Sequence, residues 1–272
     1  MAHPQIAVFA RLAEGNAKAV RKLEGQLTQL GRTMHGIAYD ALRDEFYVPQ
    51  PFAQAILAFR GGAGGEEKPL RVIQGSQTRL SNTDKVEIDP VHHELLVSED
   101  AVILIFDQMA NGNVAPKRAQ TMIGDMDIDA VSVDYVHNVI IAANPGGSKE
   151  EKFPRLLFLN RTDSGEVKPL RAVGGGKSLL TGTFGMRAHS AKGLVLVAMS
   201  GPSTIGPHDG AFVGVWSTTQ DNGDAAPRWT IGGPFGDLKQ PRGIALDVKG
   251  KNVIVSDKVL NAVLTYSFPE IF

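Results

Sequence analysis

Two sets of polar residues recur along the chain at positions where they could meet. The first set directly follows five largely apolar segments and consists of Gln50, Glu99, Asn144, Ser200 and Asp257. The second set lies five residues before the ends of five other repeated segments and consists of His35, Asp84, Asp129, Phe184 and Arg242. Carboxylates dominate these sets, and Arg242 is their one permanent cation, which is the side-chain chemistry of a metal site or an acid–base site.

Carboxylates that lie close together in a partly desolvated site raise one another's pKa values unless something neutralises them. A divalent cation would do so, and carboxylate and amide oxygens suit Ca²⁺, Mg²⁺ or Mn²⁺, whereas a histidine would admit Zn²⁺. The predicted metal ligands are Asp84, Glu99, Asp129, Asn144 and Asp257. The alternative is that these side chains line a water-filled channel and accept hydrogen bonds from backbone N–H groups.

Three side chains could move protons or balance charge beside such a cation, and they are the predicted catalytic residues. His35 and His208 could act as general acids or bases, and Arg242 could neutralise the carboxylates. His208 belongs to one of two long segments, 144–154 and 200–210, and long loops on a rigid scaffold are often functional. The predicted partner at this site is a small polar molecule or a peptide.

A repeat along the chain must position these residues. A short apolar strand that ends in an acid recurs at 36–40, 86–89, 131–134 and 243–247, and a copy at 185–189 ends in His189. The end residues are 49, 45, 55 and 58 residues apart, which is the period of four-stranded propeller blades or slightly above it. Second strands are expected at 46–48, 95–97, 139–143, 194–198 and 253–255, and third strands at 55–59, 102–106, 156–159, 212–216 and 262–266. Fourth strands are expected at 69–75, 116–124, 169–175 and 227–233.

The two ends of the chain complement each other in this scheme. The N-terminal region carries a third-type strand at 6–9 and a fourth-type strand at 19–25, and the last repeat stops after its third strand. We therefore predict an all-β fold, a β-propeller of five four-stranded antiparallel blades with one surplus strand; six blades with an incomplete first blade is the alternative. Pairing the N-terminal outer strand with the C-terminal blade would close the ring, and residues 1–272 would form a single domain.

The repeats resemble NHL-type repeats of bacterial β-propellers. The resemblance covers nearly the whole chain and is carried by the turn Asn111-Gly112-Asn113-Val114-Ala115-Pro116 and the strand Met34-His35-Gly36-Ile37-Ala38-Tyr39-Asp40. It implies the fold, but propellers of this kind serve as enzymes, as binding platforms and as scaffolds. The architecture is also similar to gluconolactonase-like propellers, which implies a metal-assisted hydrolase of lactones or esters at the mouth of the central channel. The alternative function is a non-catalytic scaffold that binds a ligand or a protein.

The composition excludes several classes of protein. With 272 residues, 43% of them hydrophobic, the chain can bury a full-sized core, and a net charge of -1 argues against a nucleic-acid partner held by electrostatics. The sequence has no cysteine, no apolar run near the roughly 18 residues of a membrane span, and no phosphate-loop frame, so no nucleotide cofactor is expected. No signal peptide is visible, so a secreted or periplasmic location would require a trimmed mature form.

Some recurring basic residues are expected to be structural. Arginines at one position of the outer strands, Arg21, Arg71, Arg118 and Arg171, are expected to protect exposed sheet edges. His92, His93 and His137 lie on first-to-second turns and are expected to be ordinary surface residues. His189 is expected to make the turn hydrogen bond that the acids make in the other repeats.

Overall fold

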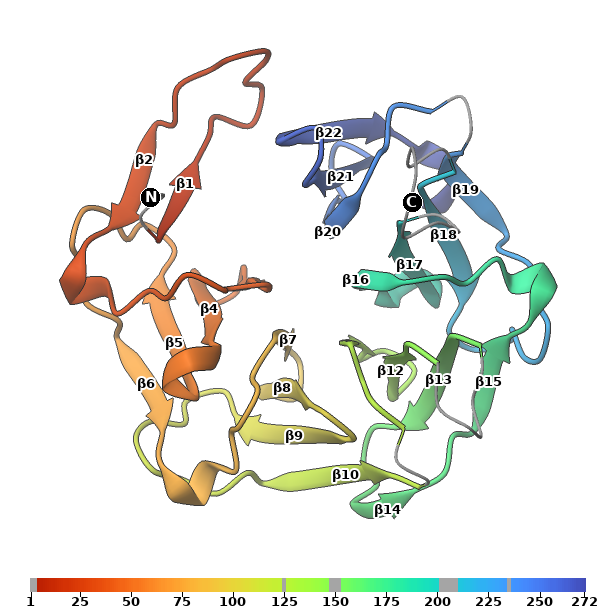
Figure 1. The fold of residues 1–272 in the computed structure, drawn as a ribbon, viewed down its shortest axis with the longest axis horizontal. Coiled ribbons are helices and arrows are strands. Elements are labelled where there is room, and N and C mark those ends of the chain that lie inside the picture. Colours follow the sequence, from red (N-terminus) through yellow and green to blue (C-terminus); the bar gives the residue numbers. More distant parts are fainter. Residues whose placement is uncertain (1–3, 124–125, 147–152, 201–209, 234–235) are drawn as a thin grey trace. The chain divides into compact units, whose positions relative to one another are not determined.

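A computed structural model describes residues 4–123, 126–146, 153–200, 210–233 and 236–272 (Figure 1). They form an all-β, five-bladed propeller of antiparallel blades, in which the helical segments are short 3-10 turns.

Blade 1 comprises β3 (Ala38–Asp40), β4 (Glu45–Gln50), β5 (Ala55–Arg60) and β6 (Arg71–Gln74), and blade 2 comprises β7 (Lys85–Asp89), β8 (Glu94–Glu99), β9 (Val102–Asp107) and β10 (Arg118–Met122). Blade 3 comprises β11 (Ala130–Asp134), β12 (Val139–Asn144), β13 (Arg155–Asn160) and β15 (Arg171–Gly174). Blade 4 comprises β16 (Thr183–His189), β17 (Leu194–Met199), β18 (Phe212–Ser217) and β19 (Trp229–Gly232), and blade 5 comprises β20 (Pro241–Asp247), β21 (Asn252–Asp257) and β22 (Ala262–Ser267).

Three further strands lie outside this regular pattern. β1 (Gln5–Val8) and β2 (Arg21–Glu24) pair with each other in an antiparallel two-stranded sheet. β14 (Gly165–Val167), which the repeat did not predict, pairs in parallel with β10. The 3-10 turns are η1 (Gln26–Thr28), η2 (Pro51–Ala53), η3 (Ser76–Thr78), η4 (Gly176–Ser178), η5 (Ser190–Lys192) and η6 (Pro269–Ile271). Within the described ranges, no helix has the length and apolar character needed to cross a membrane.

The chain divides into two compact units. Unit 1 contains residues 1–99 and 105–117, and unit 2 contains residues 100–104 and 118–272. Unit 1 therefore holds the β1–β2 pair, blade 1 and the first part of blade 2, and unit 2 holds β10 and blades 3 to 5. Each predicted strand is present, and the structure has the five predicted blades rather than six. Closure of the ring by the terminal strands would join the two units, and it stays a prediction.

The inner strands are continuously apolar because neighbouring blades cover both of their faces. All six residues of β12, β17 and β18 are buried. In unit 2, one core cluster joins blade 3 to blade 4 and includes Ile141, Phe158, Val197 and Trp216, none of which has measurable exposure. The burial of apolar surface between blades is the main force that holds each unit together.

The Asn-Gly-Asn turn that carries the family resemblance has a structural role in unit 1. The Asn111 side chain accepts a hydrogen bond from the backbone N–H of Val72 (3.0 Å), and the Asn113 side chain accepts one from Gln77 (2.7 Å). Gly112 between them has φ +76°, a conformation that favours glycine, and forms a parallel bridge with Ile73. The turn of blade 2 therefore fastens the outer strand of blade 1.

The recurring arginines of the outer strands fasten blades together as well. Three of them donate to the backbone carbonyl of the residue that follows the third strand of the next blade: Arg21 to Gly61 (2.7 Å), Arg118 to Arg161 (3.2 Å) and Arg171 to Thr218. Arg71 instead binds Glu45 and Tyr47, and the Tyr47 hydroxyl donates to the carbonyl of Gln108 (3.4 Å). Protection of sheet edges was therefore an incomplete explanation for these side chains.

His189 differs from its prediction. It precedes η5, where its side chain makes no capping hydrogen bond. Its ring is 6% exposed and lies 5.1 Å from the ring of Phe272, centroid to centroid. Burial lowers the pKa of His189 below its ordinary value of 6.5, and the nearby Lys192 lowers it further. A neutral imidazole fits against an aromatic ring, whereas the acids in the other repeats need hydrogen-bond donors.

We expect His189 to make the protein less stable in mild acid. The folded state holds His189 neutral, so below about pH 6.5 the unfolded state binds the extra proton and the free energy of unfolding falls, by up to about 1.4 kcal/mol per pH unit. The fall continues until the pH reaches the lowered pKa of the folded state. Urea unfolding of the wild type and His189→Gln between pH 8 and 5 measures this slope. Equal slopes for the two proteins would contradict the assignment.

Candidate functional site

In blades 2, 3 and 5, the polar residue at the end of the second strand binds the loop that leads into the first strand of the same blade. Glu99 is 4% exposed, and its Oε2 accepts hydrogen bonds from the backbone N–H groups of Ser81 (3.0 Å) and Asn82 (2.7 Å). The Ser81 hydroxyl also donates to Oε2 (2.9 Å), and the Thr83 hydroxyl donates to Oε1. Both carboxylate oxygens of Glu99 are therefore engaged by the loop before β7.

Asp257 has the same role in blade 5. It is 3% exposed, and its Oδ2 accepts from the backbone N–H groups of Lys239 and Gln240, both at 2.8 Å. Its Oδ1 accepts from Val259 and Leu260, both at 3.0 Å. Four backbone donors thus stabilise the buried negative charge of Asp257 without a metal ion.

Two further members of the first set, Asn144 and Gln50, bind neighbouring loops with neutral side chains: Asn144 binds the loop before β11, and Gln50 binds the turn after its own strand. The Asn144 amide donates to the carbonyl of Asp127 (2.9 Å) and accepts from the N–H of Gly146 (3.1 Å). The Gln50 side chain accepts from the N–H of Ala53 (3.1 Å). Hydrogen bonds to the backbone of neighbouring loops therefore explain why a polar residue recurs at the end of the second strand.

The described contacts of these side chains are those of loop-stabilising groups. Across the part of the chain that the structure describes, no three His, Cys, Asp or Glu side chains are placed to hold a metal ion. A cation at Asp257 would have to displace backbone N–H groups from a buried carboxylate, which leaves those donors unsatisfied. The metal-ligand role of Asp84, Glu99, Asp129, Asn144 and Asp257 stays a prediction that the observed contacts do not favour.

The structure does bring two of the predicted residues together in unit 1. The His35 Nδ1 is hydrogen-bonded to Oδ1 of Asp84. Lys85 lies beside this pair, with its Nζ 3.4 Å from the other carboxylate oxygen of Asp84 and donating to the backbone carbonyl of His35 (2.8 Å). The side chain of His35 is 57% exposed and that of Asp84 is 37% exposed, so the pair faces solvent.

The chain at Gly36 lies close to the first strand of blade 2. A Cβ on Gly36 would lie 3.4 Å from the Asp84 carbonyl and from the Cα of Lys85, which is van der Waals contact. In unit 2 the approach is closer, since a Cβ on Gly185 would clash with the carbonyl oxygen of Arg242, so that position requires glycine. The close approach of neighbouring first strands therefore brings residues of the second set side by side.

The other predicted site residues are not assembled with His35 and Asp84 by any described contact. Asp129 is exposed, and its backbone N–H donates to Ala143 (2.9 Å). Arg242 is partly buried in unit 2, and His208 lies outside the described residues. The gathering of all these residues at one channel mouth would involve both units, and it stays a prediction.

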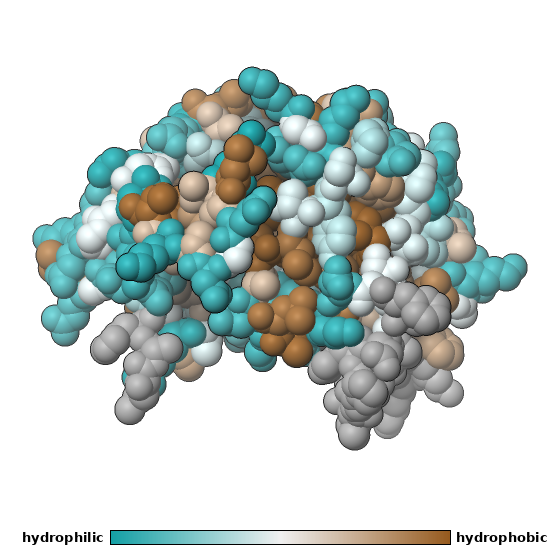
Figure 2. Space-filling model, turned by 90° about the horizontal axis from the view of Figure 1, so that it is seen from above, coloured by the Kyte–Doolittle hydropathy of each residue, from teal (hydrophilic) through white to brown (hydrophobic). Residues whose placement is uncertain are grey.

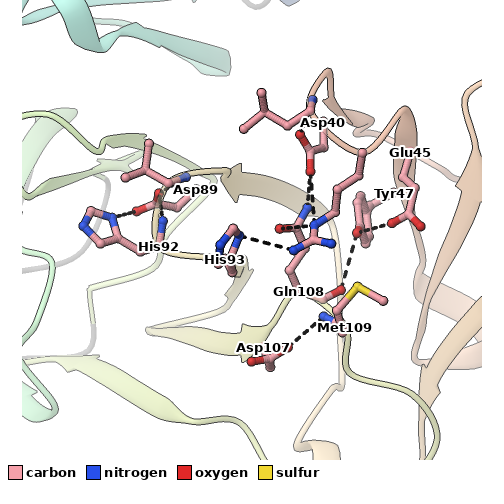
Figure 3. A network of polar contacts seen from close by, with 12 residues as sticks. Asp40, Glu45, Tyr47, Asp89, His92, His93, Asp107, Gln108 and Met109 are labelled. Carbon is pink, nitrogen blue, oxygen red and sulfur yellow. Dashed lines mark hydrogen bonds and ion pairs between the residues drawn. The ribbon is translucent and has the colours of Figure 1, made fainter.

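A second polar network lies at the first-to-second turns of blades 1 and 2 (Figure 3). Asp89 has no exposed surface and binds the N–H and Nδ1 of His92 at 2.9 and 2.7 Å. Asp40 accepts from the Gln108 amide (2.6 Å), and Arg43 lies 3.4 Å from Nδ1 of His93. These contacts hold turns in place, which agrees with the expected structural role of His92 and His93.

The same network contains a buried ion pair in blade 1. Arg71 binds both carboxylate oxygens of Glu45. Tyr47 also donates to Glu45 Oε2 (2.8 Å), as Figure 3 shows. The hydrogen bonds from Arg71 hold the pKa of Glu45 below its usual value. Burial raises the pKa of Tyr47 to about 12, and the hydrogen bond to Glu45 adds to this effect. Sequence reasoning missed this network, because its members come from strand positions without a common spacing.

Comparison with known proteins identifies the architecture. No protein-family model matches the sequence, and no curated protein matches it. A chain of hydrazine synthase from Kuenenia stuttgartiensis superposes with a TM-score of 0.62 at 13% identity, over 91% of this chain and 67% of that one. The chain has a β-propeller fold.

Two further solved structures agree with this propeller. A chain of the nidogen/laminin complex gives a TM-score of 0.58 at 11% identity, over 86% of this propeller and 75% of that chain. A chain of the mitotic checkpoint complex gives 0.56 at 14% identity, over 92% of this propeller and 65% of that chain. At such low identities the likeness establishes the fold alone, because unrelated functions occur on one fold.

Proposed function

We propose that this propeller, of the NHL-repeat type that its Asn-Gly-Asn turn resembles, is a non-catalytic binding module. Its site is the group of His35, Asp84 and Lys85 in unit 1, in which the side chains of His35 and Asp84 are in contact with solvent. The observation that carries the proposal is the contrast between this group and the other predicted site residues. Glu99 and Asp257 are buried and bound by loop donors, whereas the His35–Asp84 pair is in contact with solvent.

The chemistry of the three side chains favours a small polyhydroxylated ligand. Because Nδ1 of His35 is bound to Asp84, Nε2 is the ring atom left to contact a ligand, and it can accept or donate according to protonation. Asp84 supplies an acceptor, and Lys85 supplies a donor. A hydroxyl group both donates and accepts, so it can match each of these partners.

Nuclear magnetic resonance tests the proposal with D-glucose and D-gluconate as probes. We expect a saturable shift of the Hε1 resonance of His35, and binding about tenfold weaker or worse in His35→Gln and in Asp84→Asn, since each loses a charge-assisted hydrogen bond. His93→Gln is the matched control, because it removes another exposed histidine of unit 1 and should bind as the wild type does.

A hydrolysis assay separates binding from catalysis. The His35–Asp84 pair has the arrangement of a general base and its orienting carboxylate, so D-glucono-δ-lactone is offered as a substrate with EDTA or with Ca²⁺, Mg²⁺, Mn²⁺ or Zn²⁺. The proposal expects no turnover above buffer under any condition. Turnover that is lost in His35→Gln would contradict the non-catalytic assignment, and a wild type that binds neither probe would contradict the site.

A further inference from the structure

The chain contains two Asn-Gly dipeptides, Asn111-Gly112 in unit 1 and Asn222-Gly223 in unit 2. Both asparagines are exposed, on the turns between the third and fourth strands of blades 2 and 4. On the face of the molecule in Figure 2, apolar side chains are interspersed with hydrophilic ones, as is common on protein surfaces. The two dipeptides are more distinctive, because an Asn-Gly bond has a covalent chemistry of its own.

In an open chain, asparagine loses its side-chain amide most readily when glycine follows it. The backbone nitrogen of glycine attacks the side-chain carbonyl carbon of asparagine and forms a C–N bond. The amide nitrogen leaves as ammonia and carries away the proton of the glycine N–H. Water then opens the resulting succinimide at either carbonyl and yields aspartate or isoaspartate. Glycine favours this reaction because it has no Cβ to hinder the approach.

In unit 1, one residue of the neighbouring blade binds both reacting groups of the dipeptide. The N–H of Gly112, which carries the attacking nitrogen, donates to the carbonyl of Val72 (2.7 Å). The Oδ1 of Asn111, on the carbon that is attacked, accepts from the N–H of the same Val72 (3.0 Å). The attack requires the glycine nitrogen to give up its proton and the asparagine side chain to rotate toward it. Both hydrogen bonds must therefore break first.

Unit 2 repeats this arrangement with different residues. The N–H of Gly223 donates to the carbonyl of Ala172 (2.7 Å), and the Oδ1 of Asn222 accepts from the N–H of Ala172 (3.2 Å). Ala172 belongs to β15, the outer strand of blade 3, as Val72 belongs to β6, the outer strand of blade 1. Each set of contacts lies within one unit, so the arrangement is a property of the repeat.

A second side chain fastens each turn without taking part in this chemistry. The Oδ1 of Asn113 accepts from the N–H of Gln77 (2.7 Å) in unit 1. In unit 2, the Oδ1 of Asp224 accepts from the N–H groups of Lys177 (2.7 Å) and Ser178 (3.1 Å). Either side chain can therefore be removed while the Asn-Gly dipeptide itself stays unchanged.

We propose that Asn111 and Asn222 are deamidation sites whose rate is set by the opening of each turn from the outer strand of the preceding blade. While the turn is closed, its hydrogen bonds to Val72 or Ala172 suppress the reaction; once it detaches, the dipeptide reacts as it does in a free peptide. Isoaspartate adds a methylene group to the main chain, so the modified turn no longer matches the spacing of the N–H and C=O groups on the strand. Deamidation thus converts a transient opening into a permanent one.

Peptide mapping by mass spectrometry during incubation at mildly alkaline pH tests the proposal. The folded protein is compared with peptides of residues 107–117 and 218–228, which contain the dipeptides without the outer strands. We expect each asparagine to deamidate about tenfold or more slowly in the protein than in its peptide. The slowing should equal the hydrogen-exchange protection of the Gly112 and Gly223 amides, because the same opening frees both reactions.

Two variants loosen the turns one at a time. Asn113→Ala removes one hydrogen bond from the unit 1 turn, so we expect about fivefold faster deamidation of Asn111 and an unchanged rate at Asn222. Asp224→Ala should accelerate Asn222 and leave Asn111 unchanged, so each variant is the control for the other. Peptides with the same substitutions correct for any change in the reactivity of the open chain.

Three results would overturn the proposal. The first is an equal rate in the folded protein and in the peptides, which would show that the hydrogen bonds to Val72 and Ala172 do not protect. The second is no acceleration in either variant, with both proteins folded by circular dichroism. The third is equal acceleration of both asparagines in one variant, which would show that unfolding of the whole chain controls the reaction.

Discussion

Replacing Asp257 with alanine lowers the free energy of unfolding by about 3 kcal/mol or more. The carboxylate accepts four backbone hydrogen bonds from Lys239, Gln240, Val259 and Leu260, and it is almost fully buried. Without the carboxylate, the N–H groups in the segment before β20 and in the segment after β21 both lose their anionic acceptor. Chemical denaturation, followed by circular dichroism, measures the change.

The same experiment distinguishes a structural carboxylate from a metal ligand. If Asp257 serves the loop alone, EDTA leaves the unfolding transition of the wild type unchanged, and Asp257→Asn recovers part of the stability because its amide oxygen still accepts. Asp129→Ala is the control, since Asp129 is exposed, and we expect a change within about 0.5 kcal/mol. If EDTA destabilises the wild type as much as Asp257→Ala does, the result would support the predicted metal-ligand role of Asp257.

Replacing Arg71 with methionine is expected to lower the free energy of unfolding by about 3–5 kcal/mol. The substitution leaves the Glu45 carboxylate, which is 9% exposed, without the cation that binds both of its oxygens. Tyr47 can still donate to Glu45, but one neutral donor does not replace a bidentate guanidinium. Urea unfolding at neutral pH measures the loss.

A double substitution tests the cause of that loss. Glu45→Gln with Arg71→Met removes both charges, so we expect it to be more stable than Arg71→Met alone, because no unpaired charge remains buried. Arg60→Met is a matched control, because Arg60 pairs with Glu67 in a more exposed position, where solvent screens the charges, so we expect a much smaller loss than in Arg71→Met. Additive losses in the double variant would show that the pair is not coupled.

The strand pattern was predictable because it depends on local and periodic properties. Apolar runs, turns and closing acids can be recognised from neighbouring residues alone, and the repetition of this unit predicted the propeller architecture. The structure decided between five blades and the six-bladed alternative. β14 was missed because three residues, Gly165 to Val167, carry no apolar alternation and pair only with β10. Its formation depends on a neighbouring strand.

The site was predictable only in part. The shared repeat position of His35 and Asp84 correctly indicated that they would lie near each other, because neighbouring blades place equivalent residues side by side. The polarity of Glu99 and Asp257 indicated that these side chains make specific polar contacts. Which groups their carboxylate oxygens contact could not be predicted from the sequence. Backbone N–H groups of loops, which the fold brings close, donate hydrogen bonds to both carboxylates.

The sequence by itself therefore determined the all-β repeat, its strands and the positions at which polar residues recur, since these follow from residue type and period. Only the tertiary structure decided which polar groups are hydrogen-bonded within the protein and which face solvent. Exposure and hydrogen-bond partners depend on residues far away in the chain, so no local pattern can specify them.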